Sequence, residues 1–347
     1  MSNMNLDLSL RTLFLVTEAM PRPRTFLFDT FFANRENLDT ETVTIEFKNG
    51  RRLMAPFVDR YVDGEEMPKD TFSGRTFKPY AVAPKKTFHA DELTFERLPG
   101  ENPFSQSDPD TKRQKKIAET LQEQSEQIAR RWEAMAAETL YKLQTTIDGE
   151  GISDTIKYYD NSSTEHHTTV ASTWDNANSD PIKDIKAVLS EINKAGGTRP
   201  EAIILDPLAA ELFINNKAVQ NMMNLRNAYF GDIRPEVEGV NGASYIGTLT
   251  GLGIDVFEYQ EYYDYVDKST KQTKTKAIIP DYTALFAPKG NLVKFGAVST
   301  IKDGLLEGDL IPRTYTKEEN DTITIRTMSK PVTIPLNTKS LKVLKVK

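Results

Sequence analysis

The sequence predicts an α+β fold with an elongated shape, and three observations support this prediction. An alternating strand pattern near the N-terminus leads into a charged segment, residues 59–86, with too few apolar side chains for a core face. A helix-forming stretch then runs without proline or glycine over residues 111–146, about 54 Å at 1.5 Å per residue. A compact stretch of alternating strand and helix signals follows, and the C-terminus is rich in strand patterns. So long a helix must lie along an extended body, because ordinary helices have about three turns.

The composition excludes several classes of site. The 347 residues suffice for two or three domains, and 44 basic against 50 acidic residues give a net charge of −6. This mild acidity argues against broad nucleic-acid binding. The chain has no cysteine, which excludes disulfides, thiolate metal sites and a cysteine nucleophile. No stretch predicts a membrane helix, and Leu6–Met20 lacks the basic leader of a signal peptide, so we expect it to pack on the body or on a neighbour.

The first element is a hairpin. Val43, Ile45 and Phe47 alternate with polar residues, which is typical of a half-buried strand. Asn49-Gly50 then favours a tight turn, and residues 53–58 are expected to form the returning strand. The charged residues 59–86 carry three prolines, and a stretch of this kind is a solvated loop, a disordered segment or an arm that docks on a partner.

The long helix, residues 111–146, begins after Asp108-Pro109, a capping pair. Its apolar residues form one stripe at helical spacing, and Asp148-Gly149 is expected to end it. A coiled coil is the competing interpretation, but Ser125 and Thr139 interrupt the heptad pattern. The start of the helix is basic, where the helix dipole favours acids. This indicates either an acidic partner or a solvated helix end.

The rest of the chain alternates between loops, helices and strands. Residues 152–180 are expected to form polar loops, and residues 231–242 a loop with many turn formers. Helices are predicted over 181–195, 206–213 and 219–228. Strands are predicted over 202–205, 254–265, 276–279, 284–287, 292–298, 322–326, 332–336 and 341–346.

Motifs for catalysis or metal binding are missing. His166 and His167 are adjacent in a polar stretch and are expected at the surface, and His89 is expected to be structural. Neighbouring residues on a strand point to opposite faces, so the pair is a poor metal site. The chain has no zinc, calcium or serine-nucleophile motif. We therefore predict no catalytic, cofactor or metal residues, and a structural, assembling subunit rather than an enzyme.

Several segments together resemble one known family. They are residues 88–99 (FHADELTFERLP) running into 100–103, the Asp108-Pro109 helix start with its basic opening, Thr173-Trp174, residues 203–207 (IILDP) and residues 280–286 (PDYTALF). Each motif alone is weak, but their order and spacing cover nearly the whole chain. In these motifs the sequence resembles the major capsid protein E family of tailed bacteriophages.

This resemblance implies the tailed-bacteriophage major capsid shell fold, in which an extended loop reaches over a neighbouring subunit. It also implies a major head protein that assembles in the host cytoplasm into pentamers and hexamers of an icosahedral virion shell around double-stranded DNA. The expected parts are an N-terminal arm (1–41), a hairpin with the extended loop (42–86), a peripheral domain (87–197) with the spine helix 111–146, an axial domain (198–298) and C-terminal strands that complete the peripheral domain (299–347).

The partners follow from the same resemblance. The chain itself is the main partner, and a portal is expected with it. A separate scaffolding protein is expected because no long segment precedes the arm, and a decoration protein is an open candidate. Neither cofactor, membrane nor sequence-specific DNA contact is expected. The candidate inter-subunit contacts are Lys69, Arg75, Lys85, Lys86, Arg234 and Glu236.

Two other functions stay open at this point. One is an encapsulin-type shell that holds cargo, and the other is an α/β ligand-binding protein or enzyme built on residues 198–298. No pattern assigns a Lys–Asn cross-link between subunits.

Overall fold

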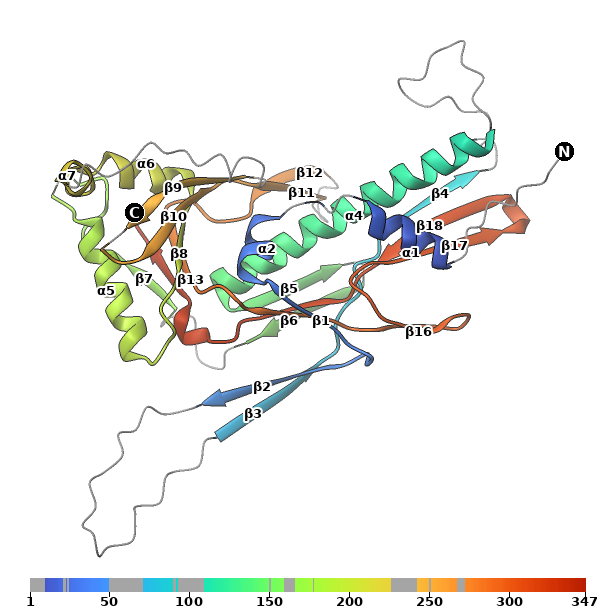
Figure 1. Cartoon of the computed structure of the whole chain (residues 1–347), viewed down its shortest axis with the longest axis horizontal. Helices are drawn as coiled ribbons and strands as arrows, with labels where there is room; N and C mark the ends of the chain where they lie inside the picture. The colour runs from blue at the N-terminus through green and yellow to red at the C-terminus, as the bar shows by residue number, and fades with distance from the viewer. Residues whose placement is uncertain are drawn as a thin grey trace, which may run out of the picture.

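The protein is an elongated body crossed by one long helix, with ribbons that project from it (Figure 1). This architecture comes from a computed structural model. It describes residues 10–20, 23, 25–49, 71–89, 92, 109–149, 151–158, 166–176, 178–225, 242–249, 251–266 and 272–347. None of the helices in these ranges is long and apolar enough to span a membrane.

Helix α4, Pro109–Lys142, is the spine of the molecule, and its 34 residues confirm the predicted long helix. Its apolar stripe packs on the same chain: Ile128, Trp132 and Leu140 join one core with residues from both ends of the sequence. The helix ends earlier than predicted because Leu143 turns to a left-handed φ of 52°. Residues 144–146 instead begin strand β5, Gln144–Gly149, which pairs with β6, Ile152–Lys157.

A six-stranded mixed sheet forms one end of the body, in the order β7-β20-β13-β8-β10-β9. Alternate residues of its central strands enter two different cores, with Ile204 in one and Ile203 in the other. Such a sheet is covered on both faces, which explains the unbroken apolar runs of its strands. The strands are β7 (His167–Thr169), β8 (Ala202–Leu205), β9 (Ala243–Leu249), β10 (Ile254–Tyr259), β13 (Thr283–Ala287) and β20 (Lys342–Lys345).

Helices cover the two faces of this sheet. Helices α5 (Pro181–Lys194), α6 (Pro207–Asn215) and α7 (Lys217–Leu225) lie together at the outer end of the body (Figure 1). Residues of all three helices enter the hydrophobic core on this face of the sheet, the one that contains Ile203. Helices α2 (Phe26–Phe31) and α4 pack on the opposite face. The sheet is therefore held between a helical layer and the spine.

The other end of the body is a smaller set of strands along α4. Strands β17 (Ile311–Lys317), β18 (Thr322–Met328) and β4 (Lys85–His89) form one antiparallel sheet. Helix α1, Leu10–Ala19, buries Leu13 in the core beneath this sheet. This contact agrees with the expectation that the N-terminal stretch packs on the body. A second sheet joins β1 (Asn34–Asn37), β14 (Leu292–Phe295) and β19 (Pro331–Ile334).

Three two-stranded ribbons complete the fold. They are β2 (Val43–Asn49) with β3 (Thr71–Phe77), β11 (Tyr262–Val266) with β12 (Thr273–Ala277), and β15 (Val298–Thr300) with β16 (Gly304–Leu306). The predicted hairpin partner of residues 43–49 was wrong, because the strand pairs along its whole length with β3. The predicted return strand, 53–58, lies outside the described residues.

Other strand predictions need correction. The single strand predicted over 254–265 is two strands, β10 and β11, which belong to different sheets. Strands β1, β4, β9, β16 and β17 were not predicted. Strand β3 and the start of β4 lie within residues 59–86, which were expected to be a loop or an arm, and β6 and β7 occupy part of the region expected to be loops. The predicted loop 231–242 lies outside the described residues except for Gly242.

Candidate assembly surfaces

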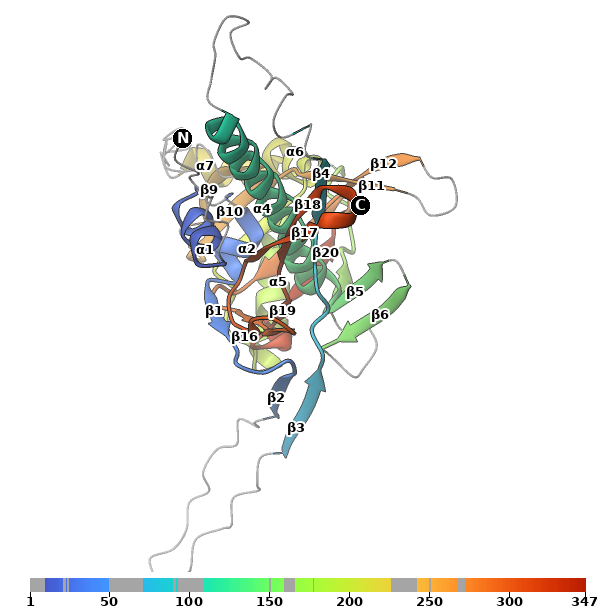
Figure 2. The same cartoon turned by 90° about the vertical axis from the view of Figure 1, so that its right-hand side faces the viewer.

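The β2–β3 ribbon is the most prominent projection from the body (Figures 1 and 2). Its base is anchored, because Val43 is fully buried against Ile156, Tyr158 and Val332. Its paired strands then leave the body, and Asn49 opposite Thr71 is the last described pair. An isolated two-stranded ribbon is only marginally stable in water, so a projecting ribbon is suited to contact another molecule.

The described candidate contact residues lie on two different elements. Arg75 lies opposite Ile45 in the β2–β3 ribbon. Lys85 and Lys86 are exposed on β4, at the edge of the three-stranded sheet. Lys85 and Lys86 are neighbours on one strand and so point to opposite faces of it, and Arg75 lies in a different sheet. Lys69, Arg234 and Glu236 lie outside the described residues.

Lys86 has a partner within its own chain. Its ammonium donates to Glu123 Oε2 of α4 at 2.9 Å, and both side chains are about half exposed. An exposed pair of this kind contributes about 0–1 kcal/mol, so a neighbouring carboxylate could replace Glu123 at small cost. No ionic partner is found for Lys85 within the described part of the chain.

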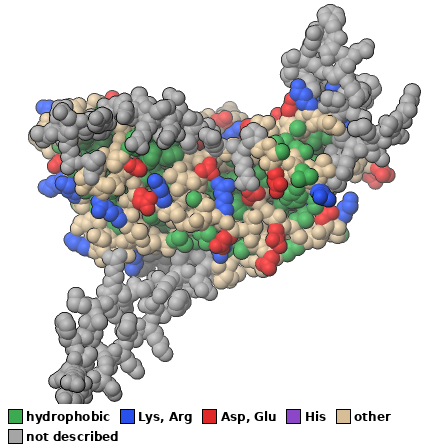
Figure 3. Space-filling view, in the orientation of Figure 1, with side chains coloured by type: hydrophobic (Ala, Val, Ile, Leu, Met, Phe, Trp, Pro, Cys, Tyr) green, Lys and Arg blue, Asp and Glu red, His purple; other side chains and the backbone are tan. Residues whose placement is uncertain are grey.

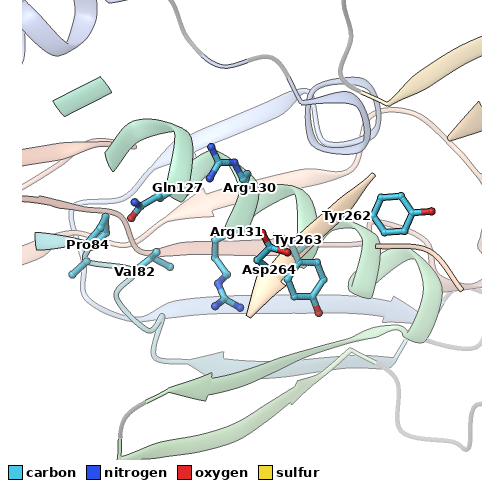
Figure 4. A pocket seen from close by; sticks show the side chains of 10 residues that line it. Val82, Pro84, Gln127, Arg130, Arg131, Tyr262, Tyr263 and Asp264 are labelled. Atoms are coloured by element: carbon cyan, nitrogen blue, oxygen red, sulfur yellow. The ribbon is translucent and has the colours of Figure 1, made fainter. Parts of the chain in front are cut away.

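A cleft of about 540 Å³ separates the spine helix from the β11–β12 ribbon. Figure 4 shows Gln127, Arg130 and Arg131 on its α4 side, with Tyr263 and Asp264 facing them from β11. The ribbon itself projects sideways from the body (Figure 2), and Tyr262 is 53% exposed on it. The cleft therefore combines two guanidinium groups with a carboxylate and open aromatic surface.

Two arginines and one carboxylate, that of Asp264, line this cleft. Arg130 lies 3.5 Å from Glu126 on the same helix. Arg131 is exposed and has no ionic partner among the residues that the structure describes. These residues could not be recognised from the sequence, because two adjacent arginines in a helical pattern do not indicate whether another element lies opposite them.

Apolar side chains are exposed at the end of the body that lies away from the six-stranded sheet. Leu15 of α1 is 58% exposed, and Ile301 at the tip of the β15–β16 ribbon is fully exposed. Figure 3 shows hydrophobic side chains gathered on this end, where α1 lies. Exposed apolar patches on a folded chain mark contact surfaces.

The two adjacent histidines occupy an unexpected environment. His166 was expected at the surface, but it is 5% exposed. Its Nδ1 lies 2.8 Å from the Leu341 carbonyl and its Nε2 lies 3.0 Å from the Tyr141 carbonyl. Burial lowers the pKa of His166 to about 4, although the hydrogen bonds to main-chain carbonyls oppose this effect. Both nitrogens face main-chain carbonyls, so the ring links Leu341, just before β20, to the end of α4.

Comparisons with known proteins agree with this architecture. The family model for phage major capsid protein E matches residues 9–346. The major capsid protein of Escherichia phage lambda is 28% identical over 244 residues, which is 69% of this chain and 70% of that protein. The major capsid protein of Enterobacteria phage phi80 is 27% identical over the same shares of the two chains.

Two solved structures show the same fold. A crystal structure assigned to the capsid protein of a prophage in Escherichia coli CFT073 has a TM-score of 0.71 at 18% identity. It covers 98% of this chain and 99% of that one. A phage-related protein from Bordetella bronchiseptica RB50 has a TM-score of 0.53 at 12% identity and covers 97% and 96% of the two chains. The predicted capsid shell fold is thus confirmed, and the chain belongs to the phage major capsid protein E family.

Proposed function

We propose that this chain builds pentameric and hexameric capsomers of an icosahedral shell that encloses double-stranded DNA. The family places the chain among the major capsid proteins of lambda-like tailed phages. The observation that carries the finer proposal is the β2–β3 ribbon, which is anchored at Val43 and leaves the body beyond its base (Figure 1). Pentamers and hexamers need contacts that close at two different angles, and a projecting ribbon can bend between them.

The roles of the individual segments of the chain are part of this proposal. Residues 1–41 act as the N-terminal arm and 42–86 as the extended loop. Residues 87–197 and 299–347 form the peripheral domain around α4, and 198–298 form the axial domain. The six-stranded sheet takes β7 and β20 from outside 198–298. These two strands tie the axial and peripheral domains together.

The role that we propose is structural and not enzymatic. A separate scaffolding protein and a portal are the further partners, and a decoration protein is an open candidate. Assembly takes place in the host cytoplasm, and the finished shell is part of the virion. Lys69, Arg75, Lys85, Arg234 and Glu236 remain proposed inter-subunit contacts. Lys86 would exchange its Glu123 partner for a neighbouring acid.

The cleft between α4 and the β11–β12 ribbon is a further contact surface in this proposal. Its occupant is the acidic tip of a second copy, the turn between β17 and β18, which carries Glu318, Glu319 and Asp321. All three are exposed and have no ionic partner in the described ranges. In Figure 1 the β17–β18 hairpin and the β11–β12 ribbon lie in different parts of the same molecule. This supports a contact between copies.

Assembly of the purified chain tests the function. We expect negative-stain electron microscopy and sedimentation velocity, with and without a candidate scaffolding protein, to show rings, hexamer-sized species or closed shells. A matched variant replaces residues 46–74 by Asn-Gly, which closes β2 on β3 at the Ile45–Arg75 pair with a two-residue turn. This variant keeps the anchored base, so it should fold and keep its body contacts but should not form closed shells.

Two results would contradict the proposal. A full chain that stays monomeric under every assembly condition would leave the shell function without support. A ribbon-truncated chain that forms shells as efficiently as the full chain would remove the ribbon from the assembly contacts.

A further inference from the structure

A buried carboxyl group connects three elements that are distant in sequence. Glu133 of α4 is completely buried. Its Oε1 accepts the Leu27 N–H and its Oε2 accepts the Phe28 N–H, each at 2.8 Å. These two amides open the first turn of α2, where a helix lacks internal acceptors. Glu133 therefore supplies the acceptors that the N-terminal end of α2 needs.

The same carboxyl group continues into the sheet. The Tyr259 hydroxyl of β10 lies 2.7 Å from Glu133 Oε1 and 2.8 Å from Glu261 Oε2. Tyr259 is almost fully buried, and its ring stacks on Phe26 at 5.6 Å between ring centres. Glu133, Tyr259 and Glu261 thus form one chain of hydrogen-bonding groups from α2 to the sheet.

These three hydrogen-bonded side chains need one proton more than two ionised carboxylates and a neutral phenol provide. A phenol has one proton to donate, and an ionised carboxylate can only accept. With both carboxylates ionised, one of the two short contacts would set the phenol oxygen against a carboxylate without a proton between them. Both are hydrogen bonds only when one carboxyl group carries a proton. Because the two acids are coupled through Tyr259, that proton belongs to the pair.

We propose that this shared proton is a latch that holds the N-terminal helix α2 on the spine helix and the sheet, so that docking of α2 weakens when the proton is lost. We call Glu133, Tyr259 and Glu261 the proton latch. The inference concerns the single chain and does not depend on shell assembly.

The surrounding charges agree with a retained proton. Burial raises the pKa of Glu133 from its usual 4.5 to about 7; Glu261 adds to this rise, and the hydrogen bonds from Leu27, Phe28 and Tyr259 oppose it. Burial also raises the pKa of Glu261, although Arg130 on α4 opposes this effect. On α2, Asp29 accepts from its own Thr25 N–H and from Arg35. Arg130 thus partly compensates the half-buried Glu261, but among the described residues no cation offsets the charge of the completely buried Glu133.

The direction of the pH dependence follows from these pKa values. When α2 undocks, Glu133 is exposed to water and its pKa returns to about 4.5. Between that value and about 7, the docked state binds one proton more than the undocked state. Docking must therefore weaken as pH rises through this window, by up to about tenfold in its equilibrium constant per pH unit. It should be nearly constant above the window.

Hydrogen–deuterium exchange of the full chain measures this docking directly. Peptides that cover residues 26–31 are followed at pH 5, 6, 7 and 8, with correction for the intrinsic exchange rate. We expect opening of α2 to increase several-fold per pH unit up to about pH 7 and then to level off. Peptides from α5 serve as the internal control and should show no such trend.

Two isosteric variants and one matched control decide the matter. Glu261→Gln gives Tyr259 a donor that needs no proton, so the pH dependence of α2 protection should be smaller than in the wild type, and the part caused by burial of Glu133 should remain. Glu133→Gln should remove the pH dependence, but with weaker protection at every pH, because one amide of α2 loses its acceptor. Glu119→Gln changes an exposed acid on the same helix and should behave as the wild type. A flat wild-type profile, or a wild-type slope in either latch variant, would overturn the inference.

Discussion

At the scale of single residues, Asp206 makes the clearest contribution to stability. Its carboxylate accepts the Leu208 and Ala209 N–H groups at the start of α6, at 3.2 and 3.3 Å. It also accepts the Thr283 N–H of β13 at 2.8 Å. We expect Asp206→Ala to lower the free energy of unfolding by about 2–4 kcal/mol, because it removes a helix cap and leaves a buried donor unpaired. Urea unfolding monitored by circular dichroism measures this change.

Asp180 provides the matched control for that prediction. It caps α5 with one bond to the Lys183 N–H at 3.1 Å, and it is exposed. Asp180→Ala should therefore cost only about 1 kcal/mol. Equal losses at the two positions would contradict the role given to the Thr283 contact.

The same residues show what the sequence can reveal at this scale. Asp followed by Pro marks the starts of α4 and α6 because capping is a local property of neighbouring residues. The burial of His166 was not predictable, because its partners, the Tyr141 and Leu341 carbonyls, lie far from it in the chain. The proton latch was hidden for the same reason, since Glu133 follows one arginine pair on a helix with many exposed acids.

At the scale of elements, the cleft between α4 and β11–β12 leads to a charge-reversal prediction. We expect Arg131→Glu to reduce shell yield without changing the thermal unfolding of the single chain, because Arg131 has no ionic partner in the described residues. Each exposed pair contributes only about 0–1 kcal/mol, but the shell repeats the contact in every subunit. Sucrose-gradient yield and electron microscopy measure the effect.

A compensating change identifies the occupant of the cleft. Glu318→Lys with Glu319→Lys should reduce shell yield alone and restore it partly when combined with Arg131→Glu. Lys115→Glu, an exposed reversal nearer the start of α4, serves as the control. Wild-type yield from Arg131→Glu would remove the cleft from the contacts. Failure of the combined variant to recover would exclude the acidic tip as its occupant.

Elements were predictable where their pattern is long or locally capped. The stripe of α4 and the apolar run Ala202–Leu205 identified their elements because each follows from one periodicity. The partner of β2 was not predictable in this way. Asn49-Gly50 favours a tight turn, but β2 pairs with β3, which begins at Thr71, and strand pairing across such a loop depends on contacts that no local pattern records. Likewise, the left-handed Leu143 ends α4 inside a helical pattern.

At the scale of the whole molecule, the elongated body and its ribbon predict how defective subunits affect a shell. A subunit that lacks residues 46–74 still offers its body to neighbours, but it offers no ribbon to the next copy. Since the contact is heterologous, each truncated copy that enters a ring leaves one neighbouring subunit without its ribbon contact. Co-expression with the full chain should therefore reduce shell yield more steeply than the fraction of truncated chains, and truncated chains should be found in the remaining particles.

Varying the ratio of truncated to full chain during co-expression separates this outcome from a loss of yield that only reflects the smaller amount of full chain. Shell yield is measured by sucrose-gradient sedimentation, and the ratio of the two chains in the particles is measured by mass spectrometry. A ribbon-intact chain with Lys115→Glu is the matched competitor, and it should enter shells without a loss of yield. A yield that falls only in proportion to the full chain, with particles free of truncated copies, would mean that the ribbon is needed for entry into a capsomer. The steeper loss instead places the ribbon contact between subunits that are already joined through their bodies.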